Sequence, residues 1–168
     1  MIDNCPHTFS KLANEILPAR MREFRQAMQS PIPLGRFAQH GVGPKAILKE
    51  MGKTKDFSAC YVLISDVPFY VGISRKVVQR LRDHVLGTDH WTASLAHMIA
   101  VKCCGYAGTR NRAGEDPDYT EAFERAKSKL SEGSVALIEI NDPVELYLFE
   151  VYAAMELDTS EWNSFATH

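Results

Sequence analysis

Two spacings of hydrophobic residues along this chain predict where helices and strands lie. From Thr8 to Gln29, apolar residues recur every three or four positions, which predicts an amphipathic helix that Pro18 splits or kinks. A short helix is predicted to begin at Pro44, because proline suits the first helical turn. The first third of the chain is therefore predicted to be helical.

A β-hairpin is predicted over residues 59–74. Its two arms, 59–65 and 68–74, are rich in β-branched and aromatic residues, as strands are. A third apolar segment, 134–140, predicts a strand that is buried on at least one face. Together these segments indicate a three-stranded, mainly antiparallel sheet.

The other periodic segments predict helices that flank this sheet. In chain order they cover about 75–86, 92–103, 119–130 and a last stretch that begins at 143. A loop rich in Gly, Asn, Asp and Pro precedes the third of them, which makes residues 105–132 an acidic insert. The predicted class is α/β in the α+β sense, with a helical extension at 1–57 and a core at 58–168.

Composition favours one compact domain with a real core, since 168 residues are 45% hydrophobic. No stretch approaches the roughly 20 uninterrupted apolar residues of a membrane helix. The start of the sequence lacks the layout of a secretion signal. We therefore expect a cytoplasmic protein with no membrane partner.

The cysteines show no spacing typical of a disulfide framework, so we expect free, buried thiols. A zinc site can be drawn from Cys103, Cys104, His90 and His97. It is disfavoured, because no C-x-x-C or H-x-x-x-H pair supports it.

Charge is divided unevenly along the chain. The net charge of −2 is the sum of +4 over residues 1–56, +2 over 57–102 and −8 over 103–168. An anionic partner such as nucleic acid would be met by the first two segments. The alternative is that the chain simply has a solvated acidic end, and that the charge division indicates no anionic partner.

Gly41 and Gly43 precede the predicted helix at Pro44, and this stretch resembles the second half of a helix-hairpin-helix. Such a glycine turn offers backbone N–H groups to a DNA phosphate. With no clear first helix before it, we prefer the alternative of an ordinary turn before a packing helix.

Glu150 is the most informative residue of the last predicted helix. Asp142, Pro143 and Glu145 form a carboxylate version of a capping box, which gives Glu145 a structural role. Glu150 instead lies in a segment that is apolar almost all round, where an ionised carboxylate costs several kcal/mol unless a cation or hydrogen bonds meet it. Either a structural arginine or a bound metal ion would satisfy it.

Arg80 and His84 share one face of the helix that follows the hairpin, because they are four residues apart. Tyr61 and Tyr70 could place both hydroxyl groups on one face of the hairpin. A solvated helix and two packing tyrosines are the plainer interpretation of these residues.

Taken together, these residues resemble the GIY-YIG nuclease superfamily over about residues 58–165. The resemblance rests on Ala59-Cys60-Tyr61, Tyr70-Val71-Gly72, Arg80 with His84, Glu150 and Asn163. Ala59 replaces the first glycine of the motif, which leaves catalysis plausible. The insert at 105–132 leaves the choice of substrate open, and residues 1–57 fall outside the match.

The resemblance implies phosphodiester hydrolysis with one divalent cation. Glu150 would hold Mg²⁺ or Mn²⁺, and Arg80 would stabilise the negative charge that grows on the phosphate. Tyr61 would orient or deprotonate the attacking water, while His84 would hydrogen-bond a tyrosine or accept the proton. Tyr70, Gly72 and Asn163 would support this network.

Contacts to backbone phosphates are expected from Arg75, Lys76, Arg82 and His90. The leading hypothesis is a metal-dependent DNA endonuclease with a restriction, mobile-element or repair role, with single strands and RNA left open as substrates. The alternative is a nucleic-acid-binding module that keeps the fold without cleaving. A purely structural α/β interaction domain is a third option.

Overall fold

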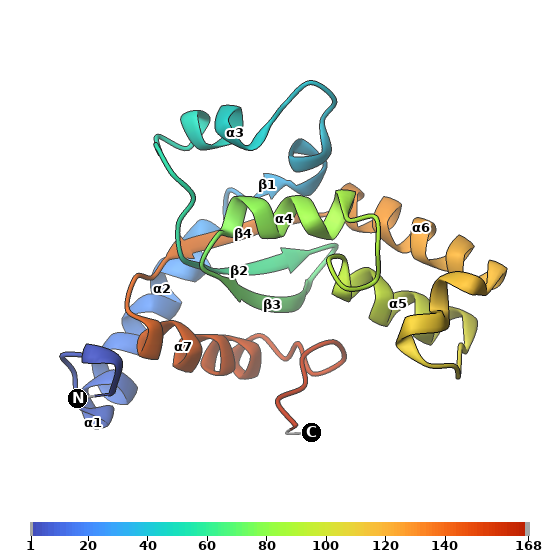
Figure 1. Cartoon of the computed structure of the whole chain (residues 1–168). Coiled ribbons are helices and arrows are strands. Elements are labelled where there is room, and N and C mark those ends of the chain that lie inside the picture. Colours follow the sequence, from blue (N-terminus) through green and yellow to red (C-terminus); the bar gives the residue numbers. More distant parts are fainter. Residues whose placement is uncertain (1, 167–168) are drawn as a thin grey trace. The chain divides into compact units, whose positions relative to one another are not determined.

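The computed structural model describes residues 2–166, and the chain forms two compact units (Figure 1). The first unit comprises the segment up to Ile32, Lys55–Val77 and the segment from Ser134 onward. The second comprises Pro33–Thr54 and Val78–Gly133. Residues of the predicted extension contribute to both units, and a division at residue 57 stays a prediction.

A β-sheet organises the first unit. Within residues 2–166 its strands are β1 (Ile32–Pro33), β2 (Ala59–Ile64), β3 (Pro68–Ser74) and β4 (Ser134–Glu139), in the spatial order β1-β4-β2-β3. The α+β class is confirmed, but the prediction of three strands was wrong, since the described sheet has four. Two residues, one of them proline, are too short to carry the alternating pattern that reveals a strand.

Strand β2 pairs antiparallel with both of its neighbours, so the predicted hairpin is confirmed. Tyr61 lies opposite Gly72 of β3 and opposite Leu137 of β4. The register shifts between Leu63 and Ile64, just before the turn. Strand β3 is at an edge of the sheet, which leaves one row of its backbone groups open to other partners.

The predicted N-terminal helix is present in three consecutive pieces. They are α1 (Phe9–Lys11), the π-helical turn η2 (Leu12–Ile16) and α2 (Leu17–Ala27), after a short 3₁₀ turn η1 (Ile2–Asn4). Pro18 lies in the first turn of α2. Proline has no N–H to give to a preceding carbonyl group, and the widened turn before it accommodates that missing bond.

Helices α2 and α7 (Pro143–Glu156) cover one face of the sheet, as Figure 1 shows. This face presents Cys60 and Val62 from β2 and Val71 from β3, which alternate with residues that point the other way. Phe24 and Phe149 meet in this core edge to face, with ring centroids 5.5 Å apart. Burying each such ring stabilises the fold by about 1.5–3 kcal/mol.

The start of α7 is fixed by its cap and by an ion pair. The Asp142 carboxylate accepts a hydrogen bond of 2.9 Å from the Glu145 N–H, as predicted. The Glu145 side chain does not return to the cap as a capping box would have it, because it accepts a bond of 2.6 Å from Arg20 Nε instead. Glu145 therefore has a structural role that ties α7 to α2.

The second unit is mostly helical. Its elements are η3 (Leu34–Ala38), α3 (Pro44–Glu50), α4 (Val77–Leu86, of which Val77 belongs to the first unit), α5 (Ser94–Cys104), η4 (Arg110–Glu115) and α6 (Pro117–Glu132). Helices α5 and α6 pack against each other (Figure 1). Gly105 ends α5 in the left-handed conformation, with φ of 69°.

The acidic insert is an integral part of this unit. Helix α6 buries a stripe that includes Tyr119, Phe123 and Leu130, and the first two rings are stacked with centroids 5.9 Å apart. The Asp116 side chain caps the helix through the Tyr119 N–H. The insert therefore supplies one side of the α5–α6 core, while most of its charged residues are exposed.

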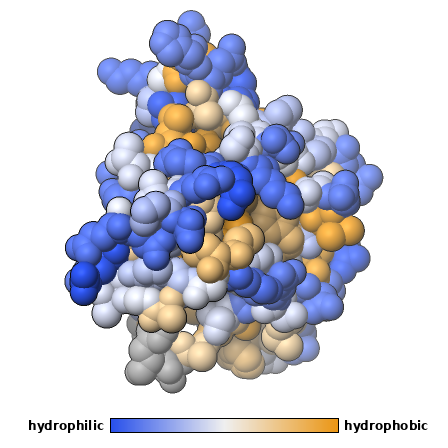
Figure 2. Space-filling model, turned by 90° about the vertical axis from the view of Figure 1, so that its right-hand side faces the viewer, coloured by the Kyte–Doolittle hydropathy of each residue, from blue (hydrophilic) through white to orange (hydrophobic). Residues whose placement is uncertain are grey.

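All four cysteines are free, as expected, and Cys5 and Cys60 are also buried. The expectation of burial was wrong for Cys103, which is exposed near the end of α5. Hydrophilic residues predominate on the face shown in Figure 2, with apolar residues interspersed among them. Among residues 2–166, no helix has both the length and the apolar character needed to cross a membrane.

Candidate active site

The two tyrosines of the hairpin lie on the same face of the sheet. Tyr61 is fully buried, and its ring centroid is 6.3 Å from that of Tyr70, with the rings tilted by 49°. The alternation of β2 and β3 places both side chains, together with Gly72, on the face opposite α2 and α7. The sequence prediction that the two phenols share a face agrees with this arrangement.

Gly72 provides the space that the Tyr61 ring occupies. A Cβ atom at position 72 would lie 2.5 Å from Tyr61 Oη and 2.6 Å from Cζ, which is closer than any non-bonded carbon tolerates. The phenol therefore crosses β3 over the bare backbone of Gly72. Because β3 is the edge strand, the Tyr61 hydroxyl group is carried toward the edge of the sheet.

Asn163 binds that same edge. Its side-chain Oδ1 accepts a hydrogen bond of 2.9 Å from Val71 N, and its Nδ2 donates one of 2.8 Å to Val71 O. The amide thus pairs with β3 as a neighbouring strand would, midway between Tyr70 and Gly72. Each such bond contributes about 0.5–1.5 kcal/mol, so Asn163 fixes the strand that carries both motif residues.

Glu150 projects from α7 on the other side of the hairpin. Partial burial raises the pKa of its carboxyl group to about 7. The carboxylate makes no hydrogen bond or ion pair with any of residues 2–166. Burial, and after it the charge of Glu150, raise the pKa of the Cys60 thiol, which places the carboxyl group near the residue before Tyr61.

The other two carboxylates of α7 give the contrast that makes Glu150 unusual. Glu145 is paired with Arg20 at 2.6 Å, and Glu156 with Arg25 at 3.1 Å. An arginine therefore neutralises each of the other two carboxylates of α7, whereas none pairs with Glu150 within residues 2–166. Since the phenols and this carboxylate come from opposite faces of the hairpin, a site that uses both must lie at the edge of β3.

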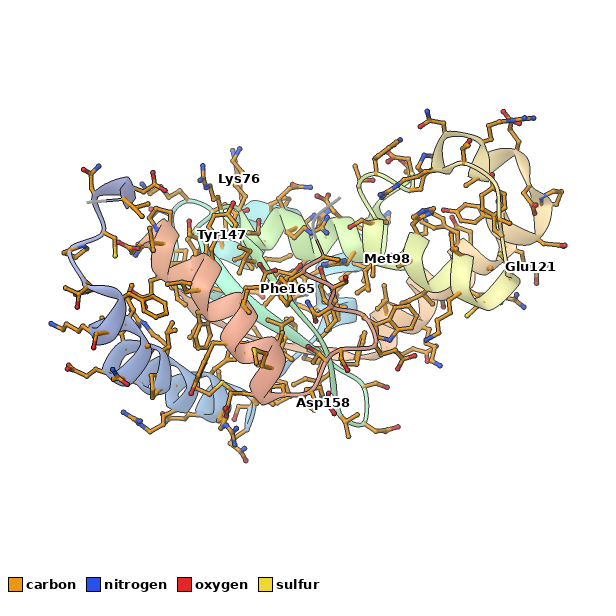
Figure 3. All side chains as sticks on the ribbon, turned by 90° about the horizontal axis from the view of Figure 1, so that it is seen from below. Lys76, Met98, Glu121, Tyr147, Asp158 and Phe165 are labelled. Atoms are coloured by element: carbon orange, nitrogen blue, oxygen red, sulfur yellow. The ribbon has the colours of Figure 1, made fainter. Side chains whose placement is uncertain are left out.

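Arg75 and Lys76 follow β3 directly and are exposed, which suits contacts with phosphates. Lys76 is labelled in Figure 3, as is Tyr147 on α7. Neither Arg75 nor Lys76 has a side-chain hydrogen bond or ion pair within the described part of the chain. Ser74 Oγ accepts a bond of 3.0 Å from the Lys76 N–H and so holds the turn between strand and helix.

Arg80, His84, Arg82 and His90 belong to the second unit. Arg80 donates from Nη1 to Thr92 O at 2.9 Å and from Nη2 to Ser94 Oγ at 2.8 Å. These bonds hold the start of α5, a role that the charge pattern of the sequence did not indicate. Thr92 O and Ser94 Oγ therefore take up N–H groups of Arg80 that were expected to bind the phosphate.

His84 is fully buried in α4. Burial, together with the nearby charge of Arg80, lowers the pKa of the imidazole to about 3. The ring is therefore neutral at pH 7 and can accept a hydrogen bond. A base with so low a pKa is a poor proton acceptor at neutral pH, so this state suits a hydrogen bond to a tyrosine better than general-base catalysis.

Arg82 and His90 were expected to contact backbone phosphates, and the fold gives them contacts of their own within the protein. Arg82 Nη1 donates to Phe37 O and to Val42 O, both at 2.9 Å, and so ties α4 to the segment around η3. The His90 ring lies 5.4 Å from Trp91 and 5.8 Å from His97, between centroids. Both residues are partly buried, and Arg82 has a structural role.

The metal that the resemblance implies would depend on Glu150. Within residues 2–166, His, Cys, Asp and Glu residues do not gather in groups of three or more that could hold an ion. Mg²⁺ nevertheless keeps several waters and is often bound by one or two carboxylates plus substrate phosphate oxygens. A single carboxyl group without an internal partner fits that chemistry.

A pocket that no sequence pattern indicated lies in the first unit, at the end of the sheet beside Arg75. Its volume is about 550 Å³, and its walls come from Ser58, Ile73, Ser74, Arg75, Asn141, Pro143, Leu146 and Tyr147. These residues lie in three separate stretches of the chain, so only the fold brings them together.

Comparison with known proteins adds no relative. No protein-family model, curated protein or solved structure matches this chain.

Proposed function

We propose that this protein is a divalent-metal-dependent endonuclease that hydrolyses DNA phosphodiester bonds through a GIY-YIG-type site. The observation that carries the proposal is Glu150, a half-buried carboxyl group with no partner among the described residues, on a helix whose other carboxylates are paired. Keeping a carboxylate in such surroundings costs stability, which is typical of a functional residue.

Glu150 would bind Mg²⁺ or Mn²⁺ when the DNA phosphate is in place. The bound cation supplies charge neutralisation at the phosphate and lowers the pKa of a bound water. The tyrosine pair is the second support for the proposal, because Tyr61 is buried and the Gly72 backbone leaves room for its hydroxyl group at the edge of β3. At that edge the phenol would orient the attacking water.

Arg75 and Lys76 would contact phosphates on either side of the cut. They are exposed and have no side-chain ion pair within residues 2–166, so their charge is available to a polyanion. By the same resemblance, Arg80 would stabilise the transition state through its guanidinium group, and neutral His84 would accept a hydrogen bond.

A non-cleaving nucleic-acid-binding module is the second candidate. It is favoured by one observation, the use of Arg80 to hold the start of α5, since a guanidinium group already bound to protein is less free to serve catalysis. This candidate leaves the unpaired Glu150 without an explanation.

Incubation with supercoiled plasmid separates the two. We expect nicked circles with Mg²⁺ or Mn²⁺ and none with EDTA, while the same protein retards a labelled duplex in a gel under both conditions. Retardation without nicking under any metal condition would favour the binding module. Nicking that persists in EDTA would contradict the metal assignment.

A further inference from the structure

The pocket beside Arg75 lies where three neighbouring strands reach the same end of the sheet. Ser58 precedes β2, residues 73–75 close β3 and Asn141 follows β4, while Pro143, Leu146 and Tyr147 from the first turns of α7 complete the wall. All of these residues belong to the first unit. A volume of about 550 Å³ falls within the range of small-ligand pockets.

The lining offers three kinds of contact. Arg75 contributes an exposed guanidinium group with no partner within residues 2–166, which suits a phosphate. The Tyr147 ring is 57% exposed and available for stacking, and it is labelled on α7 in Figure 3. Ser58 and Asn141 add a hydroxyl and an amide group to the lining. A negative charge, a flat ring and hydrogen-bonding edges are the features of a nucleotide.

The pocket adjoins the proposed metal site. Tyr147 precedes Glu150 by three residues on α7, and residues so spaced are neighbours on the helix surface, with Cβ atoms about 5–6 Å apart. A phosphate held near Glu150 would therefore place the next nucleotide of the same strand beside Tyr147.

We propose that this pocket binds the nucleotide adjacent to the cut phosphate, with its base against Tyr147 and its phosphate on Arg75. The inference rests on the proposed function, which it deepens by giving the enzyme a subsite for one base of its substrate. Ser58 and Asn141 would face the edge of that base and favour some bases over others.

Binding of single nucleotides tests this without any need for cleavage. The probes are the four deoxynucleoside 5′-monophosphates and inorganic phosphate, titrated into the ¹⁵N-labelled full chain. We expect amide signals of residues 58, 73–75, 141–142 and 144–147 to shift, with affinity for at least one nucleotide about tenfold above that for phosphate, because stacking of one base contributes about that much. Equal affinity for inorganic phosphate, or shifts at other residues, would overturn the proposal.

Two variants and their matched controls complete the test. Tyr147→Ala should weaken nucleotide binding about tenfold, and Arg75→Ala should weaken binding of both nucleotide and phosphate. The controls are Met155→Ala, at another exposed position of α7, and Arg22→Ala, at another exposed arginine. Neither control should change the binding of nucleotide or of phosphate. Nucleotide binding that Tyr147→Ala leaves unchanged would also overturn the proposal.

Plasmid nicking by the same proteins shows which of the two proposals fails. If nucleotides bind in the pocket but the wild type never nicks DNA, the proposed function is wrong and the pocket still takes nucleotides. If the wild type nicks DNA and Tyr147→Ala alters neither KM nor the preferred bases at the cut, the subsite is wrong and the nuclease proposal stands.

Discussion

The charged residues that the sequence suggested as functional are used differently in the two units. In the first unit, Glu150 and Arg75 make no side-chain bond within residues 2–166, and the fold leaves a pocket beside Arg75. In the second, Arg80 and Arg82 donate to carbonyl and hydroxyl groups and hold loops in place. Charged residues that look equally functional in the sequence therefore divide into groups that are available to a substrate and groups that the fold has already used.

Replacement of Glu150 by Gln should give the largest effect. The amide keeps the size of the side chain but removes the charge that would bind the cation, so nicking should fall at least about 100-fold. Glu156→Gln, which only breaks an exposed ion pair with Arg25, is the matched control on the same helix and should cleave normally. Single-turnover nicking rates measure both, and equal rates for the two variants would remove the distinction drawn between these carboxylates.

Gly72→Ala should lower the free energy of unfolding by about 1–3 kcal/mol, because the new methyl group overlaps the Tyr61 hydroxyl group in a fully packed position. Gly114→Ala is the control, since a Cβ there meets nothing within 4 Å, and its effect should stay within about 0.5 kcal/mol. Urea denaturation compares the two proteins. A similar small effect at both positions would mean that the phenol does not need the bare backbone of residue 72.

Arg82→Ala and Lys76→Ala test the division between used and available cations. Loss of the two bonds from Arg82 should cost about 1–3 kcal/mol of stability and leave the salt dependence of DNA binding unchanged. Lys76→Ala should leave stability unchanged and should reduce the slope of log K against log salt by about 1. If Arg82→Ala flattened the slope as much as Lys76→Ala, Arg82 would be a phosphate contact after all.

The smallest effect concerns pH. The folded state raises the pKa of Glu150 from 4.5 to about 7, so it holds a proton that the unfolded chain has already released. The wild-type free energy of unfolding should therefore fall as pH rises from about 4.5 to about 7, and Glu150→Gln should lack this contribution. Denaturation of both proteins across that range measures the difference, which should grow with pH; a constant difference would mean that Glu150 titrates normally.

Local pattern was enough to predict most of the elements. The period of apolar residues gave the hairpin, the strand at 134–139 and the main helices, because each is long enough to show its spacing. Strand β1 was not predicted, because two residues are too few to show a spacing of apolar positions. The pairing of Ser134–Glu139 with β2 is a long-range contact that the apolar run alone could not specify.

The partners of the charged residues were the part that the sequence could not predict. Arg20 and Glu145 are 125 positions apart, and Arg82 reaches back 45 positions to Phe37, so no spacing rule connects them. Glu150 was singled out because it interrupts an apolar helix, which is a local signal. Whether an arginine neutralises it depends on the fold, and within the described residues the arginines of α2 bind its neighbours instead.

Binding of Mn²⁺ to the isotope-labelled protein tests the central claim most directly, because the paramagnetic ion broadens the NMR signals of nearby groups. We predict that low Mn²⁺, added with a short duplex, broadens the signals of Glu150 and Cys60 first, and that Glu150→Gln abolishes this. Broadening that begins at the exposed carboxylates of α6, where Figure 3 labels Glu121, and spares Glu150 would contradict the account.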